Sequence, residues 1–307
     1  MSQAQPLRLS ASAVIGLITD MTIITIPPTN QTQSGFNLVE LVIVIVITGI
    51  LAVVIAPIVM KPFMAYNDTS RRVALVDAAE AAMRQIASDV RGAIPNTLRT
   101  NGTVLEIMPI QGGGRYRYGD IASDVTTLTP GAIDSEFQML GNMSSMPAGA
   151  RVVVYNTAAT LFYAAATTGL GGIITPTSST VSLTDNGNED IISLSSGFQF
   201  DLLTTGSPQK RFFLATSPVT YHCDLATGDI RRYENYSTAV AQPTSRSAAP
   251  LSVATSNAIL VNNVTACRFI YTQGTNSRAA LLTMTISLTI EGESINLLHQ
   301  VHVRNVP

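Results

Sequence analysis

Charged side chains are scarce in this sequence. Asp, Glu, Lys and Arg make up 12% of the 307 residues, about half the share usual in soluble proteins, and the net charge is −2. Ser, Thr, Asn, Gln and Ala take their place, which gives the neutral polar surface that is common on secreted or assembled proteins. No run of Lys or Arg occurs, so the electrostatic footprint of a nucleic-acid-binding protein is missing and we expect no nucleic-acid partner.

Histidine is also rare, and the side chains needed for catalysis do not gather. Of the three histidines, His299 and His302 lie three apart on an expected strand and point to opposite faces, which excludes a shared metal ion unless the strand bulges. His222-Cys223-Asp224 contains residue types that cysteine enzymes use, but neighbours on a strand face apart. No GxSxG, HExxH or P-loop pattern is present. We therefore expect no enzyme, with no catalytic residue, no metal and no cofactor.

Cysteine is nearly absent, since the chain has only Cys223 and Cys267. If the part of the chain that follows its long apolar run is exported, a disulfide between the two cysteines is the expected state. Two buried free thiols are the alternative, because the sequence does not show whether the side chains meet.

One long apolar run stands out. Leu41 to Met60 is twenty residues in which only Thr48, Gly49 and Pro57 depart from apolar character. As a helix it is about 30 Å long, the thickness of the hydrocarbon core of a bilayer, so it is a candidate transmembrane segment. A buried core helix is the alternative. A cleavable signal peptide fits poorly, because the run is too long and its only small-residue exit is followed by Pro57.

The residues at the start of this run carry a family resemblance. Gly35-Phe36-Asn37-Leu38-Val39-Glu40, followed by the apolar helix, resembles the cleavage motif of type IV prepilins. Glycine, phenylalanine, glutamate and apolar span all agree in register, while Asn37 replaces the commoner threonine. The resemblance implies that a membrane peptidase cuts between Gly35 and Phe36 on the cytoplasmic side and then methylates the new N-terminal Phe36.

The same resemblance implies roles for two further residues. Glu40 becomes the fifth residue of the mature chain (40 − 35 = 5), where its carboxylate can pair with the amine of Phe36 in its own or a neighbouring helix. This pairing offsets the cost of a lone carboxylate in hydrocarbon, about 2.5–3.5 kcal/mol. Pro57 is expected to kink the helix. The implied partners are other pilin subunits, the prepilin peptidase and methyltransferase, an inner-membrane assembly platform and the lipid bilayer.

The segment before the cut is unusual. Residues 1–35 are long for a prepilin leader and no Lys or Arg flanks Gly35, so we expect that translation starts at Met21. The sequence then divides into the leader (1–35), a transmembrane assembly helix (36–60), an amphipathic half of the same helix (61–94) and a β-rich head (95–307).

Beyond the apolar run the pattern changes from all-round hydrophobic to striped. The stripe has a spacing near 3.6 residues and consists of Val73, Val76, Met83, Ile86 and Val90. It predicts one continuous helix of about fifty residues that ends at Gly92 and Pro95. We expect the stripe to pack under a sheet.

The head is expected to be a single α+β domain with an antiparallel sheet and no second hydrophobic core. Strict alternation over 282–290, resumed by Ile295, Leu297, Val301 and Val303, predicts a terminal pair of strands around a turn at Glu291-Gly292-Glu293. Further strands are predicted at 103–110, 151–156, 161–166, 198–203 and 211–216, and a hairpin at 221–224 and 230–233. Gly112-Gly113-Gly114 is expected to be a flexible loop, and Arg115-Tyr116-Arg117 an exposed turn.

The end of the chain narrows the resemblance. Residues 291–307, with 89–96, 105–118 and 267–271, resemble minor pilins of the mannose-sensitive haemagglutinin (MSHA) pilus system of Gram-negative bacteria. This implies a type IV pilin-like fold and a structural subunit that waits in the inner membrane, head in the periplasm, before it joins a pilus at the cell surface. The alternatives are a type II secretion pseudopilin and a pilus-tip adhesin whose hydroxyl-rich loops, 167–188 and 236–257, bind a surface or a sugar.

Overall fold

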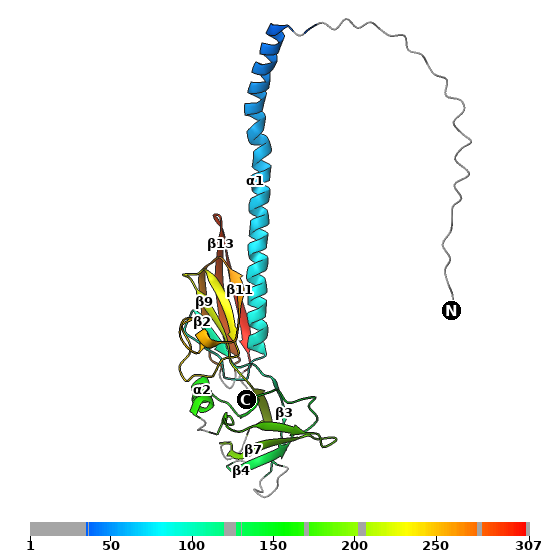
Figure 1. Ribbon diagram of the computed structural model, residues 1–307, viewed down its shortest axis with the longest axis vertical. Coiled ribbons are helices and arrows are strands. Elements are labelled where there is room, and N and C mark those ends of the chain that lie inside the picture. The colour runs from blue at the N-terminus through cyan, green and yellow to red at the C-terminus, as the bar shows by residue number, and fades with distance from the viewer. Residues whose placement is uncertain are drawn as a thin grey trace, which may run out of the picture. The chain divides into compact units, whose positions relative to one another are not determined.

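The computed structural model describes residues 35, 37–119, 127–129, 131–168, 172–201, 207–274 and 278–304 (Figure 1). The chain divides into two compact units, residues 1–61 and 62–307. Met21 and the rest of the expected leader up to residue 34 lie outside the described residues, as does Phe36. A long helix is followed by antiparallel sheets, so the chain is α+β as predicted.

Helix α1 (Leu38–Arg91) has 54 residues, close to the predicted fifty. It ends one residue before Gly92, where the sequence placed its boundary. The helix runs without interruption through Pro57 and Pro62, so neither proline ends it. The kink at Pro57 stays a prediction.

The part of α1 that belongs to the second unit buries a continuous stripe. Its members recur every three or four residues and are Leu75, Ala79, Ala82, Met83, Ile86, Ala87 and Val90. The sequence-based stripe was right for Met83, Ile86 and Val90, but wrong for Val73, whose side chain is 54% exposed. Leu75 replaces it, and the small alanines between the larger side chains let the neighbouring sheets approach the helix closely.

Two antiparallel sheets share one hydrophobic cluster with this stripe. Strands of both sheets lie beside the lower part of α1 in Figure 1. The five-stranded sheet has the order β1 (Arg99–Thr100), β2 (Val104–Ile107), β9 (Val219–Asp224), β10 (Asp229–Glu234) and β11 (Ser256–Asn262). The three-stranded sheet has the order β12 (Val264–Thr272), β13 (Ala280–Ile290) and β14 (Glu293–Val303).

The register of these sheets confirms the clearest sequence patterns. Strands β9 and β10 form the predicted hairpin, and β13 pairs with β14 along its whole length around the turn at Glu291 and Gly292. Leu282, Met284 and Ile286 are fully buried on β13, while the residues between them are only half-buried. Alternation therefore identified the strand whose one face covers the core.

The two cysteines form a disulfide, as predicted. Cys223 lies on β9 and Cys267 on β12, so the bond joins the five-stranded sheet to the three-stranded sheet. It closes a separation of 44 residues. In the chain-entropy estimate, a loop of this length stabilises the folded state by about 4 kcal/mol.

Two smaller sheets surround a second hydrophobic core, so the expectation of a single core was wrong. One sheet has the order β3 (Gly112–Arg115), β8 (Arg211–Ala215) and β5 (Arg151–Val154). The other has the order β4 (Ile133–Gln138), β7 (Ile191–Gln199) and β6 (Val181–Thr184). Buried aromatic residues from several of these strands, including Phe137 and Phe212, fill the second core.

Three local predictions were wrong. Residues 161–166 form part of a helix, α2 (Ala159–Thr168), rather than a strand. The three glycines belong to β3, not to a loop, and Gly113 is needed because a Cβ there would lie 2.6 Å from the carbonyl oxygen of Phe212. Within the expected exposed turn, Tyr116 is buried.

Candidate functional site

The residues singled out by the motif lie at the start of α1. Gly35 is exposed and stands just before the helix, while Phe36 lies outside the described residues. Asn37 acts as the N-cap: its Oδ1 accepts a hydrogen bond from the backbone N–H of Val39, 3.4 Å away. Asparagine and threonine both cap helices through a side-chain oxygen, so the departure from the commoner residue is physically mild.

The first half of α1 exposes an apolar surface on every side. It is the one helix in the described part of the chain that is long and apolar enough to cross a membrane, and none of its most apolar window is buried. Ile45 is 62% exposed and Val53 is 76% exposed. A continuous surface of this kind is unfavourable in water, so it needs lipid or neighbouring helices around it. This half of α1 is therefore a candidate membrane-spanning segment.

Glu40 is the one acid in this apolar half. Its side chain is exposed, and no hydrogen bond or ion pair to it is present among the described residues. A carboxylate in the first turn interacts favourably with the positive end of the helix dipole, by about 0.3–1 kcal/mol. This interaction with the helix dipole is smaller than the free-energy cost of placing the Glu40 carboxylate in hydrocarbon. The geometry therefore leaves Glu40 available to a cation from outside the described residues. Farther along, Pro57 is exposed within the same helix.

A second polar centre is buried inside the head around Glu106 on β2. Its carboxylate accepts hydrogen bonds from Nε of Arg99 at 2.6 Å and from the hydroxyl of Tyr236 at 3.1 Å. Glu106 is fully buried, and burial raises its pKa although the bonds from Arg99 and Tyr236 oppose the shift. The guanidinium of Arg99 also donates to the backbone carbonyls of residues 239, 240 and 241. This network therefore ties loop 236–257 to the sheet.

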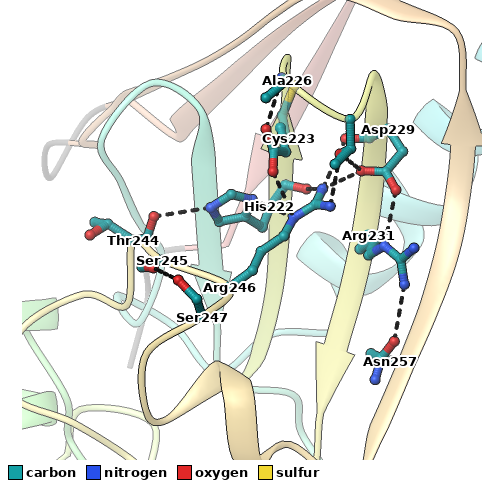
Figure 2. A network of polar contacts seen from close by, with 12 residues as sticks. His222, Cys223, Ala226, Asp229, Arg231, Thr244, Ser245, Arg246, Ser247 and Asn257 are labelled. Atoms are coloured by element: carbon teal, nitrogen blue, oxygen red, sulfur yellow. Dashed lines mark hydrogen bonds and ion pairs between the residues drawn. The ribbon is translucent and has the colours of Figure 1, made fainter.

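His222-Cys223-Asp224, the tripeptide with residue types that cysteine enzymes use, belongs to another network of polar contacts (Figure 2). Nε of Arg246 donates to Nδ1 of His222 at 3.1 Å, so that nitrogen carries no proton and Nε2 donates to the carbonyl of Thr244. Burial acts to raise the pKa of Asp229, but bonds from Arg246, Thr227 and Arg231 outweigh it and lower the pKa. The sulfur of Cys223 is held in the disulfide.

The two hydroxyl-rich loops border a common cleft. It has a volume of about 1310 Å³, and its lining includes Thr177 and Thr180 from one loop and Ser237 and Thr238 from the other. The loops are not wholly irregular, because the first contains β6 and the second contains a short 3-10 helix, η1 (Leu251–Val253). Arg151 borders the cleft and is buried. Its guanidinium donates to the carbonyls of Thr175 and Ala166, the latter in the last turn of α2.

The sequence reasoning missed the Arg99–Glu106 pair, the cleft and the role of Arg246. One sequence signal was available, because Arg99 and Glu106 lie on either side of Asn101-Gly102, a dipeptide typical of hairpin turns. In the structure Arg99 lies directly opposite Glu106 in the β1–β2 register. The other contacts join residues far apart in the chain, and no local pattern encodes them.

Within the described residues, no group of three or more His, Cys, Asp or Glu side chains could hold a metal ion. No family model, curated protein or solved structure matches this chain. The family expectation therefore stays a prediction from the sequence motifs.

Proposed function

We propose that this chain is a minor pilin, a non-enzymatic subunit needed to assemble or initiate a type IV pilus of the MSHA kind, and that it resembles the minor pilin MshO. One observation carries the proposal: the most apolar half of α1 is exposed all round and begins with a single acid, Glu40, that has no partner among the described residues. The pilin-like fold is part of the proposal.

The proposed mechanism follows from where charge and apolar surface lie. Cleavage between Gly35 and Phe36 creates an amine less than two helical turns from Glu40, and N-methylation of Phe36 keeps its positive charge. The subunit waits in the inner membrane with its head in the periplasm. Pairing between Glu40 and the amine of a neighbouring subunit then favours helix packing over isolation in lipid. The peptidase, the assembly platform and other pilins are the partners.

Two alternatives share parts of this reasoning. A type II secretion pseudopilin would use the same helix and the same processing, and it is distinguished by a secretion defect in place of a piliation defect. A pilus-tip adhesin is favoured by the cleft, which brings the loops 167–188 and 236–257 together. Deleting the exposed parts of these loops would abolish adhesion with intact piliation if the head is an adhesin.

The decisive substitution is Glu40→Ala. We expect the variant to insert and to be cleaved normally, because neither step needs the carboxylate, but to be lost from sheared pili with a strong fall in pilus number. The measurement combines immunoblotting of the pilus fraction with mass spectrometry of the membrane-bound chain. The mature N-terminus should be N-methylated Phe36.

Glu80→Ala is the matched control, because Glu80 is an exposed acid on the same helix that pairs only with Arg84. It should assemble as the parent chain does. Normal piliation with Glu40→Ala would defeat the pairing argument. A mature chain that begins at Ser2 or Met21 would overturn the processing step.

A further inference from the structure

Many arginines of the head pair with acids: Arg71 with Glu291, Arg99 with Glu106, Arg231 with Asp229, Arg232 with Asp89, and Arg246 with Asp224 and Asp229. Several others make no ion pair within the described residues. Four of these border two neighbouring hollows, and we name them the cationic face: Arg91, Arg115, Arg211 and Arg304.

Three members of the cationic face border one hollow of about 800 Å³. Arg91, Arg211 and Arg304 line it together with His302, and no Asp or Glu of the described residues lies in its wall. Arg91 is the last residue of α1, where a cation stabilises the helix dipole. The helix dipole therefore accounts for Arg91 but not for Arg211 or Arg304.

A neighbouring hollow of about 640 Å³ extends the same charge. Arg115, Arg117 and Lys210 line it, and the one acid among the described residues of its lining is Glu189, which pairs with Arg117. Gln209 borders both hollows. Across the β3–β8 pair, Arg115 lies directly opposite Arg211, and two like charges in that position destabilise a sheet. Positive charge without an ion pair among the described residues is therefore concentrated at Arg91, Arg115, Arg211 and Arg304.

We propose that the cationic face binds a linear anionic polysaccharide carrying sulfate or carboxylate groups. Guanidinium groups bind such anions through paired hydrogen bonds, and a polymer presents them in a series that can span both hollows. This face gathers four arginines without an ion pair in the described residues around two neighbouring hollows, which is the charge that a polyanion needs. The inference is independent of the assembly role.

The lining favours a sugar polymer over nucleic acid or lipid. Binding of single-stranded nucleic acid relies on exposed rings for base stacking, but Tyr116 is buried and the ring of Tyr118 is covered by the Lys210 amine at 3.4 Å. Arg91 lies 29 residues along α1 from Pro62, or about 44 Å, which places it at the opposite end of that helical segment from the apolar half. Lipid headgroups are therefore a poorer fit.

The test uses the full chain in non-ionic detergent and fluorescent heparin as the sulfated probe. Polygalacturonate serves as the carboxylate probe, and neutral dextran and double-stranded DNA as comparison polymers. We expect binding to heparin, with an affinity that falls roughly a hundredfold between 50 and 200 mM salt if four contacts release counterions. The triple variant Arg91→Gln/Arg211→Gln/Arg304→Gln should bind at least about tenfold more weakly at 50 mM salt.

The matched control is Arg72→Gln/Arg84→Gln/Arg268→Gln, which removes the same charge from exposed positions off the cationic face. It should bind within about twofold of the parent chain, and a triple Arg→Lys variant of the face should bind with an affinity between those of the parent chain and the triple glutamine variant, because lysine keeps the charge but loses the paired hydrogen bonds. Equal losses in the two glutamine variants would overturn the site. Binding to dextran, or tighter binding to DNA than to either glycan, would overturn the ligand class.

Discussion

The two halves of α1 reverse the usual relation between hydrophobicity and burial. The first half, up to Met60, is the most apolar stretch of the chain, and its side chains are all exposed. The second half contains many alanines and charged residues, yet it buries a complete stripe from Leu75 to Val90. Side chains of this helix are therefore buried where the chain supplies a sheet for them to pack against, whatever their hydrophobicity.

The difference also separates two kinds of packing. The buried stripe alternates large side chains with Ala79, Ala82 and Ala87, a pattern that fits one particular surface, the inner faces of the two main sheets. The first half has no such stripe, since β-branched residues cover all its faces. Such a surface fits lipid, or identical helices in a bundle, equally well. One continuous helix therefore belongs half to a folded head and half to an environment outside the chain.

The sharpest way to break this comparison is to make the same truncation in each half. Leu75→Ala removes a side chain that is only 2% exposed, and we expect it to lower the free energy of unfolding of the head by about 3 kcal/mol. Leu51→Ala removes one that is 51% exposed, and it should change head stability by less than about 0.5 kcal/mol. Urea unfolding of the full chain in detergent, followed by near-ultraviolet circular dichroism, measures both.

Val73→Ala provides a second control within the packed half. Val73 belongs to the stripe drawn from the sequence, but its side chain is 54% exposed, so its truncation should also cost less than about 0.5 kcal/mol. If Val73→Ala destabilised the head as much as Leu75→Ala, Val73 would belong to the buried stripe, as the sequence predicted. If Leu51→Ala did so, the two halves would not be independent.

Long and strictly periodic patterns were the ones that predicted structure correctly. The alternation in β13 and β14 continues for about nine residues in each strand and the apolar run of α1 for twenty, so a single exception does not change the interpretation. The stripe of α1 was partly wrong because Val73 and Leu75 lie on different faces of the helix, and the spacing fits either one with most of the remaining members. Only packing against the sheets decides between them.

Short apolar runs were ambiguous in the way that physics predicts. Residues 161–166, Leu-Phe-Tyr-Ala-Ala-Ala, were predicted as a strand on their apolar character, but alanine is the best helix former and the run has no β-branched residue. At the candidate site, a motif located Glu40. The partners of Glu106 were not predictable in full, because Tyr236 is 130 residues away and meets it only through the fold.

Glu40 and Glu106 extend the comparison to charged side chains, and the pH dependence of stability tests the role of Glu106. Burial raises its pKa in the folded head, so its stabilising contribution is present below the unfolded value near pH 4.5 and is lost as the pH rises through the folded value. The stability of the parent chain relative to Glu106→Gln should therefore decline as the pH is raised. The slope should not exceed about 1.4 kcal/mol per pH unit, because one proton is involved. Urea unfolding at a series of pH values measures it.

Tyr236→Phe sharpens this result, because it keeps Glu106 but removes a hydrogen bond that lowers its pKa. The decline in stability should move to higher pH in this variant, while Arg99 remains in place as the charged partner. A decline that moved to lower pH, or a difference between the parent chain and Glu106→Gln that stayed flat, would show that Arg99 compensates the buried charge fully. Glu106 would then be an acid whose own chain supplies all the positive charge it needs, the opposite of what the structure indicates for Glu40.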